Sequence, residues 1–314
     1  PIEVHWSEVP GRDEKWKKET IRNTSPAQFR AEFECEFLGS VLTLVNPAKL
    51  KSMAYVKPIQ ERNDGLKIYE EPKEGHMYFM GVDVSRGKEI DYHATTIIDM
   101  TETPYRVVAQ YRNNDIPPFL LPNMLYPMAK RYNDAYMMIE INDIGQEISD
   151  ILHNEMEYEN LLTTSVRGRK GQVMDGGFGN FDTQRGIRMS PKVKRVGCAM
   201  LKELIENDKV IIEDYHIINE LASFVSKKQS YEAEVGHHDD LVTTLILFAW
   251  SSTQPYFKDL TDINIRDKLY KQKIEKLEEE LMPFGFLSDA VEEETRFTDS
   301  EGTVWNVVDD EPRL

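Results

Sequence analysis

Residues 77–84 read Met77-Tyr78-Phe79-Met80-Gly81-Val82-Asp83-Val84, a nearly continuous apolar run with one carboxylate near its end. A run without polar alternation is typical of a strand that is buried on both faces, as in the centre of a sheet. Ser, Arg and Gly follow at 85–87, a composition that favours a turn. We therefore expect a central strand that carries Asp83 at its C-terminal end.

Strand and helix patterns continue outward from this run. Two more β-rich runs follow it directly, and helical and strand patterns then alternate up to residue 251. This order predicts an α/β fold in which a mixed central sheet is flanked by helices on both faces. The expected strands are 77–84, 94–100, 105–111, 135–141, 161–166 and 210–213, and the expected helices are 118–131, 143–156, 191–207, 215–225 and 239–251.

Composition limits the possible partners. The 314 residues include 38 Lys and Arg against 55 Asp and Glu, which gives a formal net charge of -17. Contact with nucleic acid therefore requires a local basic patch, because the bulk charge opposes it. The most apolar stretch, 241–250, is too short to span a bilayer, so we expect no membrane partner. With two cysteines, no signal peptide and no initiator Met, the sequence favours an intracellular fragment that is not secreted.

Changes in composition suggest four parts. Ser25 and Pro26 are typical of a helix start, and Gly39 ends the helix that we expect over 26–37. The following residues contain several prolines and predict short strands and turns rather than a core. Beyond Phe257 the chain is acidic and has few apolar runs. The expected parts are 1–39, a linker at 40–76, the main domain at 77–257 and an acidic tail at 258–314.

Acidic residues lie at the ends of predicted strands. Asp83 ends the first strand, Glu140 ends the fourth, and Asp239 and Asp240 precede the last helix. Adjacent parallel strands end at one rim of a sheet, and a packed helix can bring its first turn there. Crowded carboxylates repel each other, and Mg²⁺ or Mn²⁺ relieves that repulsion. A pair of such ions about 4 Å apart activates water and stabilises the leaving 3′ oxygen in phosphodiester hydrolysis.

These residues also have structural interpretations. Asp83 alone can simply end a strand, and either Asp239 or Asp240 can cap a helix. Asp91 can return to the same rim at the start of the second strand, and His238 is either a general base or a surface residue. The sequence contains no G-x-S-x-G motif and no P-loop, so neither serine hydrolysis nor P-loop nucleotide hydrolysis is supported.

Basic residues gather between 167 and 195, where only Asp175 and Asp182 oppose them. The glycines at 176–179 allow a loop to follow a phosphate backbone, and the next helix presents its N-terminal amides to anions. A solvated loop is the alternative interpretation. Beside a carboxylate cluster, a groove for the DNA backbone is the better one. The expected DNA contacts are Arg167, Arg169, Lys170, Lys192, Lys194 and Arg195.

Several short motifs follow one another across roughly residues 78–253. They are Gly81-Val82-Asp83-Val84-Ser85-Arg86-Gly87, Asp91-Tyr92-His93-Ala94, Tyr136 to Glu140 with Asn142 and Gly145, Lys194-Arg195-Val196-Gly197-Cys198, and His238-Asp239-Asp240-Leu241-Val242. In order and spacing they resemble the nuclease domain of the large terminase subunit of T-even-type tailed bacteriophages. The preceding Ala27-Gln28-Phe29-Arg30 resembles the end of the ATPase domain of that family.

The resemblance implies an RNase H-like fold and a metal-dependent endonuclease that cuts concatemeric viral DNA, with two Mg²⁺ or Mn²⁺ ions per site. The implied ligands are Asp83, Glu140 and one of Asp239 and Asp240, of which we favour Asp240, with Asp91 as an auxiliary ligand. The implied partners are double-stranded DNA, the phage portal protein, the small terminase subunit and an ATPase domain in cis, in the cytoplasm of the bacterial host.

Two other classes of function remain open. A junction resolvase or a transposase-type nuclease shares the acids of this fold group. A non-catalytic module that docks on the portal is the third possibility, in which the carboxylates only cap helices and end strands.

Overall fold

The computed structural model describes residues 6, 9–23, 43–85, 91–141, 144–166, 171–175, 183–227, 230–262, 296–298 and 304–306. The helix expected over 26–37 lies outside these residues. The chain divides into two compact units, Pro1–Ile265 and Arg266–Leu314. In the second unit the described residues form an antiparallel hairpin of β13 (Arg296–Thr298) and β14 (Val304–Asn306).

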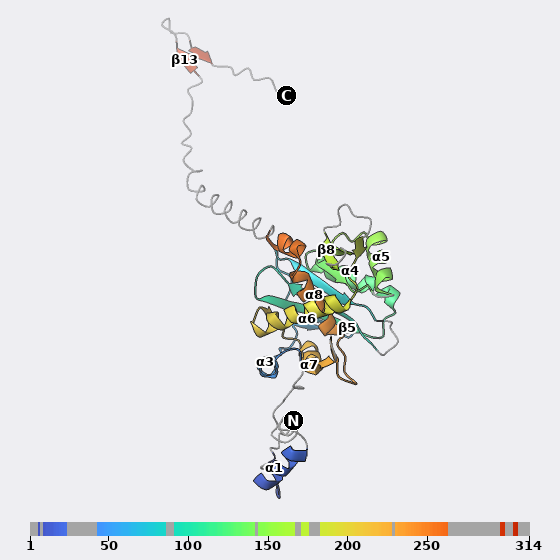
Figure 1. The fold of residues 1–314 in the computed structure, drawn as a ribbon. Helices are drawn as coiled ribbons and strands as arrows, with labels where there is room; N and C mark the ends of the chain where they lie inside the picture. Colours follow the sequence, from blue (N-terminus) through green and yellow to red (C-terminus); the bar gives the residue numbers. More distant parts are fainter. Residues whose placement is uncertain are drawn as a thin grey trace. The chain divides into compact units, whose positions relative to one another are not determined.

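A mixed sheet forms the centre of the first unit (Figure 1). Its strand order is β1-β2-β5-β4-β3-β6, and β10 also pairs with β5. Strands β3, β4 and β5 are antiparallel neighbours, whereas β6 and β3 run parallel. The strands are β1 (Gln60–Glu61), β2 (Leu66–Ile68), β3 (Tyr78–Asp83), β4 (His93–Asp99), β5 (Tyr105–Asn113), β6 (Tyr136–Ile139) and β10 (Val210–Ile211).

Helices cover both faces of this sheet, as the sequence predicts (Figure 1). Tyr78, Met80 and Val82 of β3 pack with α4 and α5, whereas Phe79 packs with α6 and α8. Successive strand residues point to opposite faces, so both faces of β3 are buried and its sequence is continuously apolar. The helices are α1 (Glu14–Asn23), α3 (Pro47–Ser52), η2 (Pro118–Leu120), α4 (Pro122–Arg131), α5 (Gly145–Asn154), α6 (Pro191–Glu206), α7 (Tyr215–Ser223) and α8 (Asp240–Ser252).

Among the described helices, none is both long enough and apolar enough to cross a membrane.

The segment before β3 contributes more to the core than the sequence predicts. Its strand β2 pairs with β5, and both Leu66 and Ile68 are buried in the cluster that also contains α4 and α5. The expectation of short strands and turns outside the core was therefore wrong for β2. The strand is too short to give a clear pattern, and its burial depends on a partner distant in sequence.

Two small sheets lie beside the central one. Strand β7 does form where a strand is expected, but it pairs with β8 and β9 rather than with the central sheet. A hairpin of β11 and β12 follows α7 directly. These strands are β7 (Thr163–Val166), β8 (Gln172–Asp175), β9 (Thr183–Arg185), β11 (Phe224–Lys227) and β12 (Ser230–Ala233).

Helix α8 lies unusually close to the elements on either side of it. A Cβ atom on Gly81 of β3 would lie 2.8 Å from the carbonyl oxygen of Thr244. A Cβ atom on Gly197 of α6 would lie 2.8 Å from the carbonyl oxygen of Ile246. The two glycines therefore let the backbone of α8 approach both β3 and α6, and this contact fixes where the first turn of α8 stands.

We predict that Gly81→Ala destabilises the protein by about 1–3 kcal/mol, because the added methyl group forces α8 away from β3. Gly197→Ala gives a sharper comparison, since alanine ordinarily stabilises a helix interior by about 1 kcal/mol relative to glycine. Urea unfolding followed by circular dichroism measures both effects. Unchanged stability of Gly81→Ala, or a gain in stability of Gly197→Ala, would show that the added methyl group fits against α8 without displacing it.

Candidate active site

A cavity of about 450 Å³ lies at the C-terminal ends of β3 and β6. It is lined by Asp83 at the end of β3, by Glu140 just beyond β6, and by Asp239 and Asp240 at the start of α8. Val82 and Ile139 are register partners in the parallel β3–β6 pair, so the residues that follow them are neighbours. The Glu140 amide donates to the Val82 carbonyl over 2.9 Å, which continues the pairing by one residue.

The alternation of side chains along β3 and β6 places the carboxylates of Asp83 and Glu140 on the face of the sheet that α8 covers. Phe79 of β3 and Met138 of β6 belong to the core cluster that contains α6 and α8. Asp83 and Glu140 lie an even number of residues further along and therefore point to the same face. Asp91 also lines the cavity, as an exposed residue ahead of β4. The structure thus brings together all the acids that the sequence singles out.

Burial and mutual repulsion raise the pKa values of these acids. Burial raises the pKa of Asp83 well above its usual range, and the charges of Glu140 and Asp240 raise it further. Burial also raises the pKa of Glu140, although the nearby charge of Lys194 lowers it. The pKa of Asp240 rises to about 6 through burial, against the opposing charge of His238. The cavity therefore favours a bound positive charge, either a proton or a cation.

The donor set suits hard divalent cations, which prefer oxygen ligands. Within the part of the chain that the structure describes, no group of three His, Cys, Asp or Glu side chains is already arranged to hold a metal ion. The acids are therefore a set of carboxylates around one cavity rather than a finished coordination sphere. Their chemistry and their repulsion fit a divalent cation.

Lys194 lies among the acids. Its Nζ atom is 3.9 Å from Asp239 Oδ2, and the side chain is mostly buried in the lining of the cavity. Lys194 is one of the expected DNA contacts, and that role stays a prediction. Its position here gives it another effect, which is to offset part of the repulsion between the carboxylates.

The cap of α8 differs from the sequence expectation. Asp239 occupies the N-cap position, but its side chain makes no capping hydrogen bond. The amides of Leu241 and Val242 instead donate to Glu220 Oε2 of α7, over 2.9 and 3.1 Å. The alternative interpretation, in which the side chain of Asp239 or Asp240 caps this helix, is therefore contradicted, because a carboxylate from another helix takes that place.

Glu220 is not among the residues that the sequence predicts at the site. No local pattern marks it, since its capping role depends on the contact between α7 and α8.

The carboxylate of Asp240 has its own contacts. Its Oδ2 atom accepts a hydrogen bond from the Tyr92 amide over 3.4 Å and lies 3.6 Å from His238 Nδ1.

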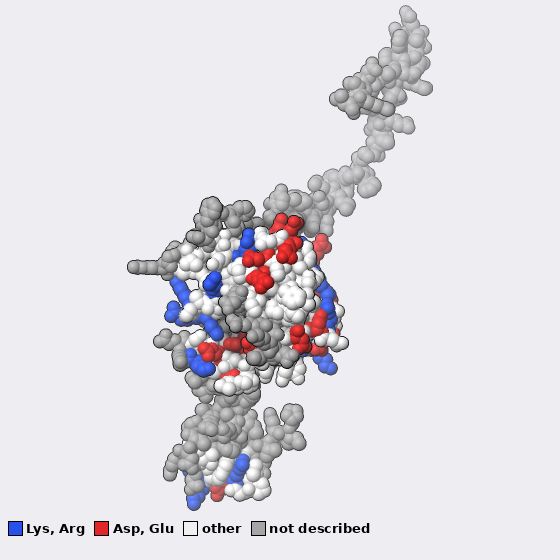
Figure 2. Space-filling model, turned by 90° about the vertical axis from the view of Figure 1, so that its right-hand side faces the viewer, with Lys and Arg blue, Asp and Glu red and all other residues white. Residues whose placement is uncertain are grey.

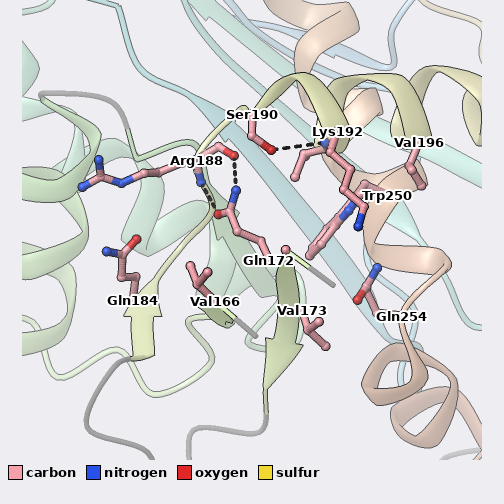
Figure 3. Close-up of a pocket in the computed structure, with 12 residues that line it drawn as sticks. Val166, Gln172, Val173, Gln184, Arg188, Ser190, Lys192, Val196, Trp250 and Gln254 are labelled. Carbon is pink, nitrogen blue, oxygen red and sulfur yellow. Dashed lines mark hydrogen bonds between the residues drawn. The ribbon is translucent and has the colours of Figure 1, made fainter. Parts of the chain in front are cut away.

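The basic residues of α6 diverge around the helix. Lys192 and Arg195 are exposed, whereas Lys194 faces the acids. Lys192 and Arg188 line a second cavity of about 670 Å³, between the small β7 sheet and α6 (Figure 3). Gln172 exchanges two hydrogen bonds with the backbone of Arg188, of 2.7 and 2.9 Å, which attaches β8 beside α6. The remaining expected DNA contacts, Arg167, Arg169 and Lys170, lie outside the described residues.

The face drawn in Figure 2 carries separate acidic and basic patches rather than one continuous basic surface. This distribution agrees with the net charge of -17 and with the expectation that any DNA contact is local.

A family model described as the terminase RNase H-like domain matches residues 80–250. The chain belongs to the terminase RNase H-like domain family. The matched residues run from β3 into α8 and include Asp83, Glu140, Asp239 and Asp240. The expected RNase H-like fold and the resemblance to terminase nucleases are confirmed, while the relation to T-even-type phages in particular stays a prediction.

Solved structures of terminase nucleases are similar to this chain. The large terminase nuclease from thermophilic phage G20c with bound magnesium has 19% sequence identity and a TM-score of 0.51, over 68% of this chain and 98% of that chain. The same nuclease with bound cobalt has 19% sequence identity and a TM-score of 0.49, over 68% of this chain and 98% of that chain. The large terminase nuclease domain of Thermus phage P74-26 has 20% sequence identity and a TM-score of 0.47, over 65% of this chain and 93% of that chain. The first of these likenesses supports the fold.

We predict that the metal-free protein loses stability as the pH rises from about 4 to about 7. The folded state raises the pKa of Asp240 to about 6, so its proton stabilises the fold at low pH and is lost through that range. Asp240→Asn should reduce the pH dependence by on the order of 2 kcal/mol. Urea unfolding in EDTA at several pH values measures it. The same pH dependence in both proteins would contradict the crowding of these acids.

Proposed function

We propose that this chain is the endonuclease part of a viral genome-packaging terminase, which cuts concatemeric double-stranded DNA by metal-dependent phosphodiester hydrolysis. The observation that carries the proposal is the meeting of Asp83, Glu140 and Asp240 at one cavity, from β3, β6 and α8. Membership of the terminase RNase H-like domain family supports it.

The proposed cofactors are two divalent cations, Mg²⁺ or Mn²⁺. Asp83, Glu140 and Asp240 would hold them, with Asp239 and Asp91 as further ligands. When bound, such ions activate a water molecule and stabilise the leaving 3′ oxygen. The G20c nuclease, which has been crystallised with magnesium and with cobalt, supports a divalent cation in this family.

The chain's own residues prepare the cavity for this chemistry. The side chains of Asp83 and Glu140 point to the same face of the sheet and line one cavity, so both could contribute to one cation site. Lys194 supplies positive charge beside Asp239 and Glu140, which allows several acids to be ionised together. Lys192 and Arg195, exposed on the first turns of α6, would hold the DNA backbone through its phosphates.

The proposed partners are double-stranded DNA, the portal protein, the small terminase subunit and an ATPase domain in cis, in the host cytoplasm. A junction resolvase would prefer branched DNA over a linear duplex, so cleavage of both substrates separates that alternative. A portal-docking module would cut neither.

We predict that Asp83→Asn and Glu140→Gln each reduce plasmid nicking by orders of magnitude in Mg²⁺ and in Mn²⁺, because each removes a charged metal ligand. Neither variant should lose stability, since each relieves repulsion. Asp99→Asn is the control, because Asp99 pairs with Tyr78 at the opposite end of β3 from Asp83. Retention of more than roughly a tenth of wild-type nicking by either variant would reject the assignment.

A second prediction concerns two of the expected DNA contacts on α6, Lys192 and Arg195, and two in the basic stretch of sequence before it, Arg169 and Lys170. Alanine at Arg169, Lys170, Lys192 and Arg195 should weaken duplex binding regardless of sequence. It should also flatten the salt dependence of binding by about one unit of slope for each phosphate that is no longer neutralised. Lys194 is kept, because its removal would alter the cavity. Fluorescence anisotropy at several salt concentrations gives both quantities, and an unchanged affinity and slope would show that these residues do not contact phosphates.

A further inference from the structure

Arg112 and Glu220 form a buried pair beside the candidate active site. Arg112 lies near the end of β5 and Glu220 lies on α7, and their side chains are only 15% and 4% exposed. An Arg112 guanidinium nitrogen lies 3.6 Å from Glu220 Oε1. Neither residue lines the cavity that holds the acids.

Glu220 controls the first turn of α8. Its Oε2 accepts hydrogen bonds from the amides of Leu241 and Val242, the two residues after Asp240. Burial raises the pKa of Glu220, while the charge of Arg112 and the two amide hydrogen bonds lower it and favour the ionised carboxylate. If Glu220 were absent, these amides would take the nearest carboxylate, which is that of Asp239 or Asp240. Glu220 therefore leaves both aspartates free to face the cavity.

Arg112 reaches Asp240 by a second route. Its guanidinium carbon lies 3.7 Å from the centre of the Tyr92 ring. The Tyr92 amide donates to Asp240 Oδ2 over 3.4 Å, and the Tyr92 ring meets the His238 ring edge to face at 5.1 Å. Arg112 thus holds both the residue that caps α8 and the residue that orients the Asp240 carboxylate.

The pair is not explained by stability alone. Arg112 Nε and Glu220 Oε1 are buried atoms without a hydrogen-bond partner. Incompletely satisfied buried polar atoms are costly, and a buried ion pair is often no more stabilising than apolar residues of the same volume. Such a pair next to a cluster of acids points to a role in the cluster.

We propose that Arg112 and Glu220 are positioning residues, which hold the first turn of α8 and the Asp240 carboxylate in the arrangement that binds the divalent cation. The inference rests on the proposed function. Neither residue lines the cavity. Glu220 therefore acts through the first turn of α8, and Arg112 acts through Glu220 and Tyr92.

Mn²⁺ binding measured by isothermal titration calorimetry tests this proposal without relying on activity. Glu220→Ala should weaken Mn²⁺ binding by about tenfold or more, a typical loss when a residue that supports a metal ligand is removed. Glu220→Gln should stay within about threefold of wild type, because its amide oxygen can accept from the same two amides. Equal losses in the two variants would overturn the capping account.

Asn46→Ala is the matched control, because the Asn46 side chain caps α3 by accepting from the Ala48 amide over 2.8 Å. Both Glu220→Ala and Asn46→Ala should lower the melting temperature, but only the former should weaken Mn²⁺ binding. If Glu220→Ala does not fold, Arg112→Lys decides the question, because lysine keeps the charge but loses the flat contact with Tyr92. Wild-type affinity in Arg112→Lys would then overturn the proposal.

Asp83→Asn separates this inference from the function on which it rests. If wild type neither nicks DNA nor binds Mn²⁺, or if Asp83→Asn behaves as wild type, the proposed function fails. If Asp83→Asn is inactive while Glu220→Ala binds Mn²⁺ as tightly as Asn46→Ala does, only the positioning role fails.

Discussion

The close contact between α8 and the middle of β3 is the constraint on which the arrangement of the candidate site depends. Gly81 has no side chain, so the backbone of the helix lies against the strand at Thr244. The first turn of α8 then falls at the end of β3, where parallel pairing has already placed Asp83 beside Glu140. Gly197 lets α6 pack equally closely on the other side of α8. That contact carries Lys194 into the same cavity, so one packing geometry assembles residues from four elements.

Electrostatic balance follows from this geometry. Carboxylates brought together by packing cannot all be ionised without compensation. Lys194 supplies part of the compensation, and the raised pKa of Asp83 indicates that the rest is still required. Arg112 balances Glu220 separately, behind the first turn of α8. The site therefore has two layers of charge, an open layer that faces the cavity and a buried layer that supports it.

Local patterns predicted most of the fold and the acids of the site. The apolar run of β3 is visible because both of its faces are buried, and Asp83 and Glu140 stand out as charges next to such runs. Tertiary contacts decided the rest. Strand β7 forms as expected, yet it joins a separate sheet, and β2 adds to the core only through β5. Glu220 could not be recognised, because its partners on α8 lie more than 20 positions away and no periodicity connects them.

The late position of α8 in the chain has a consequence for synthesis. The helix is almost entirely buried, from Leu241 to Ser251, yet it lies 157 positions after Asp83 at its start. A ribosome therefore releases β3, β4 and β6 well before the helix that covers one face of them. Until α8 emerges, that face of the sheet is exposed to water and to chaperones. The third carboxylate arrives with the helix that completes the core, so a nascent chain cannot gain the full acidic site before it gains its stable fold.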